Sequence, residues 1–125
     1  MRKRIDYARR RTSRAINIGE GELYSIAISM SDLESDRLQK MAEAVLDEDR
    51  PSMNELFRRA LRWHHQRHYP HIDLPGTPDR WERYMRRLQR MGVIRPGGRS
   101  RFLVRTALDY AKWVRRNRGK EARDE

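Results

Sequence analysis

A run of alternating residues constrains this chain most, because it predicts one strand with no evident partner. Residues 23–30 are LYSIAISM, in which large apolar side chains alternate with small ones. Alternation with a period of two residues is typical of a strand with one buried face. The large side chains would face a core and the small ones would face outward: Tyr24, Ile26, Ile28 and Met30 against Ser25, Ala27 and Ser29. So short a strand is unstable unless another strand pairs with it.

Two amphipathic helices are predicted directly after this strand. Ser31 and Glu34 have the spacing of a capping box, in which a serine hydroxyl and a glutamate carboxylate each satisfy a free backbone N–H. Apolar residues then recur at i, i+3, i+4 and i+7, and acidic residues followed by Pro51 end the pattern. Ser52 and Glu55 form a second capping box before another apolar stripe. The segment is therefore a strand, a helix, a polar turn and a helix.

Such a unit cannot complete its own core. Its strand leaves hydrogen bonds open, and a chain of 125 residues has room for one compact domain or two very small ones. Small units of this kind often depend on a second copy for their core. We therefore expect a mainly helical fold with a short β ribbon, formed either by a homodimer or by two copies of the unit within one chain.

The order and spacing of these elements resemble the ribbon-helix-helix family of Arc-type and MetJ-type DNA-binding proteins. The resemblance covers residues 22–69 and is carried by IAISMSDLESDRLQKMAEAVL followed by RPSMNELFRRAL. In that family two antiparallel strands enter the major groove, and the starts of the second helices hold phosphates. On this chain the resemblance implies three base-facing residues and three phosphate-binding ones, namely Ser25, Ala27 and Ser29, and Ser52, Met53 and Asn54.

An alternative remains open for this unit. Its outward residues are small, and Asp47, Glu48 and Asp49 stand just before the implied phosphate site, where acidic groups are unfavourable. In this alternative the unit mainly dimerises, and the basic segments on either side of it bind the partner.

The second half of the chain, residues 70–118, partly repeats the first. Residues 103–108, LVRTAL, share L-x-R-x-A-L with residues 56–61, 47 positions earlier. Thr77 with Pro78 predicts a helix start, and residues 71–74 alternate as a second ribbon strand would, with His71 and Asp73 facing outward. This arrangement resembles the tandem units of TraY-type relaxosome proteins. The alternative is a helical hairpin added to an ordinary dimeric ribbon.

A further phosphate site is predicted where the last helix begins. Arg99, Ser100 and Arg101 stand there, and the N-terminus of a helix together with arginine favours phosphate binding. We expect alanine at Arg99 and Arg101 to weaken DNA binding and to lower its salt dependence.

The charge of the chain indicates a polyanionic partner. The formal net charge is +11, and residues 1–19 and 77–118 hold most of the excess, whereas residues 20–76 are slightly acidic. Residues 1–21 are predicted to be a disordered basic arm that orders on phosphate, the alternative being a solubilising segment. Its cations are Arg2, Lys3, Arg4, Arg9, Arg10, Arg11 and Arg14. Residues 119–125 form a tail of nearly balanced charge.

Several classes of function are not indicated. The chain has no cysteine, no phosphate-binding glycine loop and no nucleophile elbow, so we expect neither an enzyme nor a cofactor. His64 and His68 share a helix face, but histidines near a helix end interact with its dipole, so we expect no metal.

Trp81 continues an apolar stripe and is predicted to be core, while Trp113 stands among arginines. Because no apolar run suits a membrane span or a secretory signal, we expect a cytoplasmic, nucleoid-associated protein.

The leading hypothesis is therefore a protein that binds double-stranded DNA. It would act as a transcriptional repressor or as an accessory factor that marks a plasmid or phage site, with a relaxase as a protein partner. The resemblance also allows an antitoxin, whose partner would be a toxin. The competing class is an RNA-binding component of a ribonucleoprotein, because such proteins are also small and basic.

Overall fold

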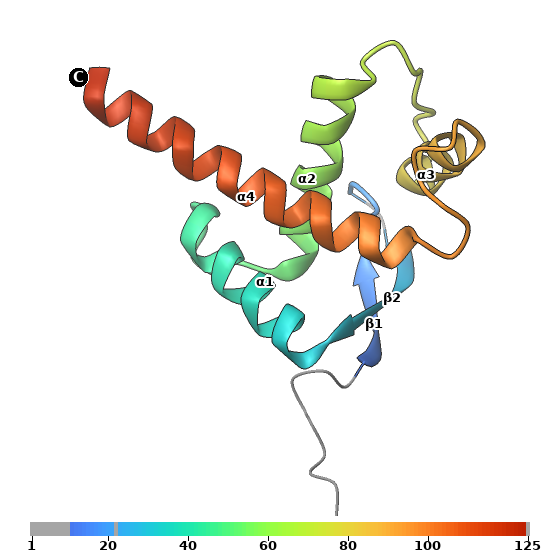
Figure 1. Cartoon of the computed structure of the whole chain (residues 1–125), viewed down its shortest axis with the longest axis horizontal. Helices are drawn as coiled ribbons and strands as arrows, with labels where there is room; N and C mark the ends of the chain where they lie inside the picture. The colour runs from blue at the N-terminus through green and yellow to red at the C-terminus, as the bar shows by residue number, and fades with distance from the viewer. Residues whose placement is uncertain (1–10, 22, 125) are drawn as a thin grey trace, which may run out of the picture.

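The computed structural model describes residues 11–21 and 23–124, with side chains as far as Arg118, and begins with a β hairpin (Figure 1). Strands β1 (Arg11–Asn17) and β2 (Ser25–Ser31) pair antiparallel, with Arg11 opposite Ser31 and Asn17 opposite Ser25. The N–H of Ile18 donates to the carbonyl of Tyr24 at 3.0 Å and extends the ladder toward the turn. Gly21 has a φ of 78° in that turn, a conformation that glycine adopts without the steric cost of a Cβ.

The hairpin corrects two expectations. The partner of β2 is β1 of the same chain, and neither a second molecule nor residues 71–74 supplies the paired strand. Arg11 and Arg14, expected in a disordered arm, lie on β1. Ile16 and Ile18 are 4% and 0% exposed, and burying such side chains stabilises the strand more than a few cations weaken it. The other arm residues, Arg2, Lys3, Arg4, Arg9 and Arg10, lie outside the described residues.

Helices α1 (Asp32–Val45) and α2 (Met53–His68) confirm the helices predicted after the strand. The capping box of α1 is complete: the Glu34 N–H donates to the Ser31 hydroxyl, and the Ser31 N–H donates to the Glu34 carboxylate. The second box is half formed. Ser52 accepts from the N–H of Glu55, whereas the Glu55 carboxylate turns to Arg58 and Arg59.

Helices α3 (Arg80–Arg90) and α4 (Arg99–Asp124) make up the second half. Residues 71–74 do not form the predicted second strand: they lie in the irregular connection from α2 to α3, where the Ile72 N–H donates to the Tyr69 carbonyl. Because β1 already pairs with β2, His71 and Asp73 belong to no ribbon. The start of α3 also differs, since Asp79 rather than Thr77 is its N-cap.

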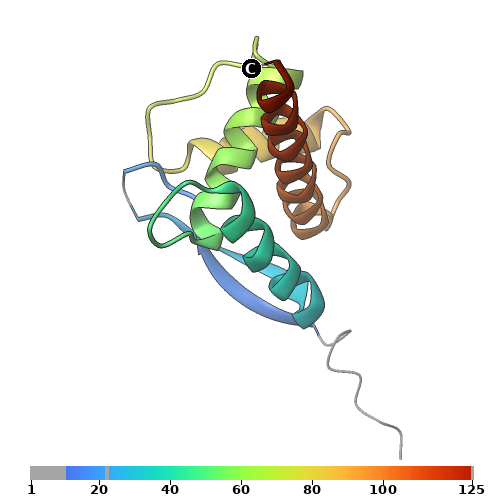
Figure 2. The same ribbon diagram turned by 90° about the vertical axis from the view of Figure 1, so that its left-hand side faces the viewer.

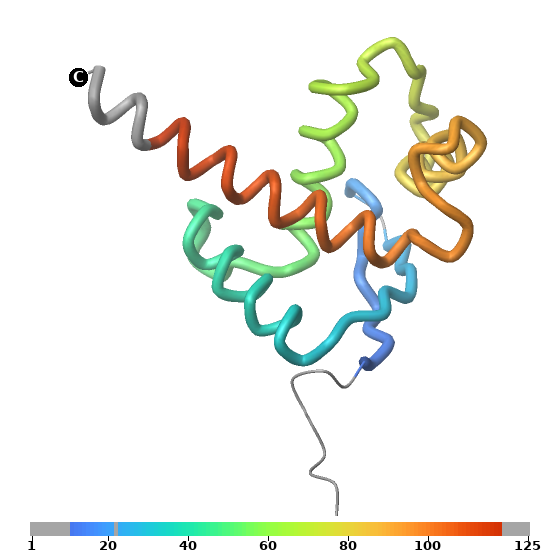
Figure 3. The backbone as a smooth tube through the Cα atoms, in the orientation of Figure 1, coloured from blue at the N-terminus to red at the C-terminus, as the bar shows by residue number. Residues whose placement is uncertain are grey.

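α4 holds the molecule together. It packs against α2, α1 and β2, and it crosses the two earlier helices with its first turns beside β2 (Figures 1 and 3). Arg118 of α4 donates to the carbonyls of Ala44 and Val45, which the last turn of α1 would otherwise leave unpaired. In the turned view the hairpin lies below the helices, and α4 extends upward and away from it (Figure 2).

The core lies where the four helices and the inner face of the hairpin meet. Phe57, Leu61, Trp81 and Tyr84 are all 2% exposed or less, and burial of each contributes on the order of 1.5–3 kcal/mol. The predicted stripe of α3 and the core position of Trp81 are thereby confirmed. No helix within the described ranges is long and apolar enough to cross a membrane.

Candidate nucleic-acid interface

The face of the hairpin that points away from the core carries small side chains. Directly opposite residues of two paired strands share a face, and the pairs on this side are Ser13 with Ser29, Ala15 with Ala27, and Asn17 with Ser25. We call Ser13, Ala15, Ser25, Ala27 and Ser29 the outer face. All are exposed except Ser29, which is half-buried. The predicted base-facing residues of β2 therefore do share a solvent-facing surface, and β1 adds two more positions to it.

Arg11 extends the outer face at the end near α1. Its guanidinium donates to the hydroxyl and to the carbonyl of Ser29, at 3.2 and 2.9 Å, and pairs with Glu34 at 3.3 Å. The side chain is still 52% exposed, so the pair with Glu34 contributes little to stability. A cation is thus held beside the small residues of the outer face.

The start of α2 is attached to the edge of β1. The backbone N–H of Asn17 donates to Oδ1 of Asn54 at 3.2 Å, and the Asn17 carbonyl accepts from Arg58 at 3.0 Å. The Ser52 hydroxyl caps its own helix. Of the predicted phosphate site Ser52, Met53 and Asn54, two side chains are therefore already used, and the backbone N–H groups of the first turn are what α2 offers an anion.

Acidic groups near the start of α2 are balanced by arginine. Partial burial acts to raise the pKa of Glu55, but hydrogen bonds and positive charge from Arg58 and Arg59 outweigh it and lower that pKa. Arg59 also pairs with Glu48 at 2.5 Å. The acids that opposed a phosphate site in the sequence are thus partly neutralised within the fold.

The start of α4 is attached to the edge of β2 in the same manner. The Ser29 N–H donates to the hydroxyl of Ser100 at 2.9 Å. Arg99 is half-buried and pairs with Glu82 of α3 at 3.2 Å. Tyr24, just before β2, also contacts Glu82. Arg101 is exposed, and the first turn of α4 contains no acidic residue. Of the three residues predicted to bind phosphate here, only Arg101 presents an uncommitted charge.

The hairpin therefore lies between the starts of the two longest helices, one attached to each edge. Sequence reasoning missed the contribution of β1, although a signal existed: Thr12, Ile16 and Ile18 alternate with small residues, and a Gly-Glu-Gly turn follows. His71 and Asp73, which were expected in this surface, are exposed residues of the connection between α2 and α3.

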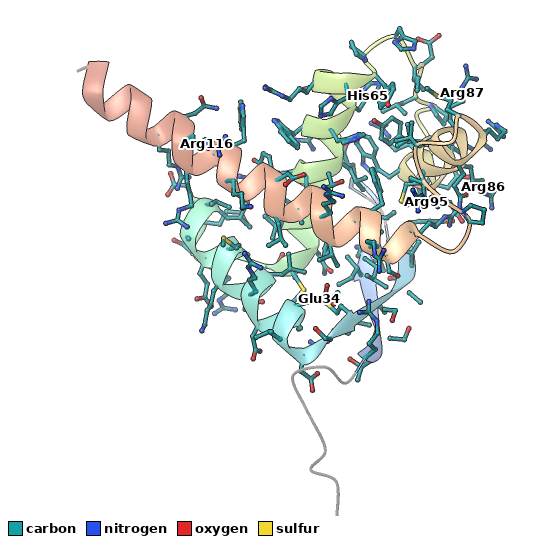
Figure 4. All side chains as sticks on the ribbon, viewed as in Figure 1. Glu34, His65, Arg86, Arg87, Arg95 and Arg116 are labelled. Carbon is teal, nitrogen blue, oxygen red and sulfur yellow. The ribbon has the colours of Figure 1, made fainter. Side chains whose placement is uncertain are left out.

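Three of the four histidines lie at the other end of α2, and two of these serve packing. Nδ1 of His64 lies 2.7 Å from the Tyr84 hydroxyl, and Nε2 of His65 lies 2.7 Å from the Ile72 carbonyl, facing α3 (Figure 4). Burial, and then the charges of His68 and His65, lower the pKa of His64 to about 4. In the part of the chain that the structure describes, no three potential ligands gather for a metal.

Comparisons of this chain with models of known families, with curated proteins and with solved structures give no match.

Proposed function

We propose that this protein binds double-stranded DNA, with the outer face of the hairpin in the major groove. The observation that carries the proposal is the pair of attachments at the hairpin edges, Asn17 to Asn54 and Ser29 to Ser100. They fix the starts of α2 and α4 on either side of a two-stranded ribbon. The major groove admits such a ribbon, and helix starts beside it would meet the flanking phosphates.

Base contacts would be few and small. The hydroxyls of Ser13 and Ser29 are able to donate to or accept from base edges, and the methyl groups of Ala15 and Ala27 suit the thymine methyl. Arg11 adds a cation at one end of the outer face. Most of the affinity would therefore come from phosphate contacts, which position the protein but carry little sequence information.

The biological role that fits this surface is that of a repressor or a site-marking accessory factor. Both roles need a small protein that occupies one duplex site, and both occur in the ribbon-helix-helix family that the sequence resembles. The structure supports the coarser part of that resemblance, a mainly helical fold with a two-stranded ribbon.

Substitution on the outer face tests the proposal. Glutamate at Ala27 would place a negative charge in the groove, so A27E should bind a selected duplex at least about tenfold more weakly at unchanged fold stability. A44E is the matched control, because Ala44 is an exposed alanine on α1, away from the hairpin. The duplex would first be selected from a random library, with total RNA offered in parallel.

Three outcomes decide between the classes of function. Enrichment of one duplex sequence, together with loss of binding in A27E but not in A44E, supports the proposal. Failure to enrich any duplex sequence, or equal affinities of A27E and A44E, contradicts it. Preferential retention of RNA would indicate the ribonucleoprotein class instead.

A further inference from the structure

The basic side chains of this protein divide into two groups by what they contact. Most arginines of α2 and α3, and Arg11 of β1, are held by carboxylates, whereas no ion pair within the described residues is formed by Arg14, Arg67, Arg87 or Arg90. The recorded pairs join Arg11 to Glu34, Arg58 to Glu55, Arg59 to Glu48 and Glu55, Arg62 and Arg80 to Glu20, Arg83 to Asp79, and Arg86 and Arg99 to Glu82. These arginines serve the fold. The cations of α4 beyond its first residue differ.

Five cations of α4 form a surface that we call the α4 stripe: Arg101, Arg105, Lys112, Arg115 and Arg116. All five are exposed, and no ion pair joins any of them to a described carboxylate. At about 100° per residue they fall within roughly 100° of one another around the helix axis. The stripe extends about 22 Å along the helix, at 1.5 Å per residue.

The α4 stripe faces away from the core. Leu103, Ala107 and Ala111 are 1% exposed or less and form the opposite side of α4, which packs against α1 and α2. Arg116 lies far along α4, on the other side of the molecule from Arg86 and Arg87 of α3 (Figure 4). The stripe begins beside the hairpin, where Ser100 contacts Ser29, and then runs away from it.

This arrangement is unfavourable for the isolated protein. Like charges at i and i+4, such as Arg101 with Arg105 and Lys112 with Arg116, destabilise a helix by a few tenths of a kcal/mol per pair. Asp109 is the one acidic residue between Arg99 and Arg118. By contrast, the exposed side of α1 mixes Arg37 and Lys40 with Asp36 and Glu43. A polyanion bound along α4 would supply the missing negative charge.

We infer that the α4 stripe beyond Arg101, which the proposed function assigns to the first segment, binds the phosphate backbone of a second DNA segment, so that one molecule holds two duplex segments together. The inference rests on the proposed function, in which the outer face of the hairpin holds the first segment. Most of α4 extends away from the hairpin toward the C-terminal end of the helix, so the stripe beyond Arg101 is remote from a duplex that lies on the outer face (Figures 1 and 2). Once one segment is bound, a second part of the same DNA is present at high effective concentration.

Duplex DNA fits the stripe better than other polyanions do. Binding to a membrane surface would require a free apolar side on α4, but that side is buried against α1 and α2. Binding to a single strand relies on aromatic rings that stack on bases. The nearby rings of Tyr110 and Trp113 stack on each other, with centroids 6.3 Å apart, and both contact Trp63. A convex row of cations is suited to backbone contacts without base recognition.

A capture experiment tests this inference with the full chain. One duplex of the selected sequence is fixed to beads, the protein is added, and retention of a second, fluorescently labelled duplex is measured. The variant R105E/K112E reverses two charges of the stripe, and R37E/K40E reverses the same two residue types on α1. Loss of two phosphate contacts should lower capture of the second duplex by about tenfold or more in R105E/K112E, with little change in R37E/K40E.

The amount of protein on the beads separates this inference from the proposed function. If the protein itself is not retained, binding of the first segment has failed. If R105E/K112E is retained and still captures the second duplex as the unmodified protein does, the inference is overturned. It is also overturned if two protein molecules that associate with each other, and not one molecule, hold the two duplexes together. A labelled RNA captured in preference to the duplex would overturn the choice of DNA.

Discussion

Asn17 and Asn54 attach the hairpin to α2, the backbone N–H of Asn17 donating to Oδ1 of Asn54 at 3.2 Å. The side chain of Asn17 also organises the turn, because its own Oδ1 accepts from the N–H groups of Gly19 and Tyr24, each at 3.0 Å. On the other edge of the hairpin, Ser100 accepts from the N–H of Ser29. The side chains of Asn54 and Ser100, which the sequence analysis assigned to phosphate, thus bind the backbone of the hairpin. These two hydrogen bonds set where α2 and α4 begin relative to the ribbon.

Alanine at Asn54 is expected to destabilise the fold and to leave the salt dependence of DNA binding unchanged. Loss of the hydrogen bond leaves a half-buried N–H of Asn17 without its partner, which costs about 1 kcal/mol of unfolding free energy. Because the Asn54 side chain does not itself hold phosphate in this proposal, the slope of log affinity against log salt should stay the same. Urea unfolding and binding at several salt concentrations measure the two effects.

Ser100→Ala should behave in the same way, and the two losses should add, because the contacts are on opposite edges of the hairpin. Gln66→Ala, at an exposed position on α2, is the control and should change neither quantity. A lower salt slope in N54A would show that the side chain meets phosphate after all.

Substitution of Arg101 should affect DNA binding, whereas substitution of Arg99 should affect the stability of the fold. R101A should lower the salt slope by about one unit, since each phosphate contact contributes roughly 0.9, and should leave stability unchanged. R99A should cost up to about 1 kcal/mol of stability, because Glu82 is only 16% exposed and loses one of its cations. This revises the sequence-based expectation that both arginines act on phosphate.

Thermal unfolding at low and moderate salt, together with fluorescence anisotropy on the selected duplex, measures both variants. Equal salt slopes for R101A and the unmodified protein would remove the start of α4 from the interface.

The segment from β2 to α2 was predictable because its signals are local. The signals are the alternation over residues 23–30, the box of Ser31 and Glu34, and the Ser52 cap, and each spans only a few residues. Both helices begin where their caps predict, and the strand forms over Ser25–Ser31, two residues later than the start of the alternation. β1 escaped prediction because its cations dominate the composition, and Arg14 stands on the side of the strand that also carries Ile16. Arg14 interrupts the alternation of apolar residues, so the pattern does not indicate a strand. Ile16 is nevertheless buried once β1 pairs with β2.

The site itself depended on contacts that no local pattern encodes. Ser29 and Ser100 are 71 residues apart, and their hydrogen bond follows only from the packing of α4 across the molecule. The repeat of L-x-R-x-A-L suggested a second strand before α3, but the position beside β2 was already taken by β1, and Ile72 became part of the core at 9% exposure. Competition for one strand edge is decided by tertiary structure and not by sequence similarity.

The burial of His64 beside Tyr84 should make the fold sensitive to mild acid. Burial holds the pKa of His64 at about 4, below its ordinary value of 6.5, so the unfolded chain takes up a proton between these pH values while the folded protein does not. Stability from this group is complete above about pH 6.5 and is lost as the pH falls toward 4. Since His64 is incompletely buried, the loss of unfolding free energy should be about 2 kcal/mol, below the full value of the shift.

His64→Phe keeps an aromatic ring against Phe102 and removes the titration. Urea unfolding at neutral pH and near pH 4.5 should therefore show a smaller loss of unfolding free energy in this variant than in the unmodified protein. Equal losses in both proteins would assign the acid sensitivity to other groups.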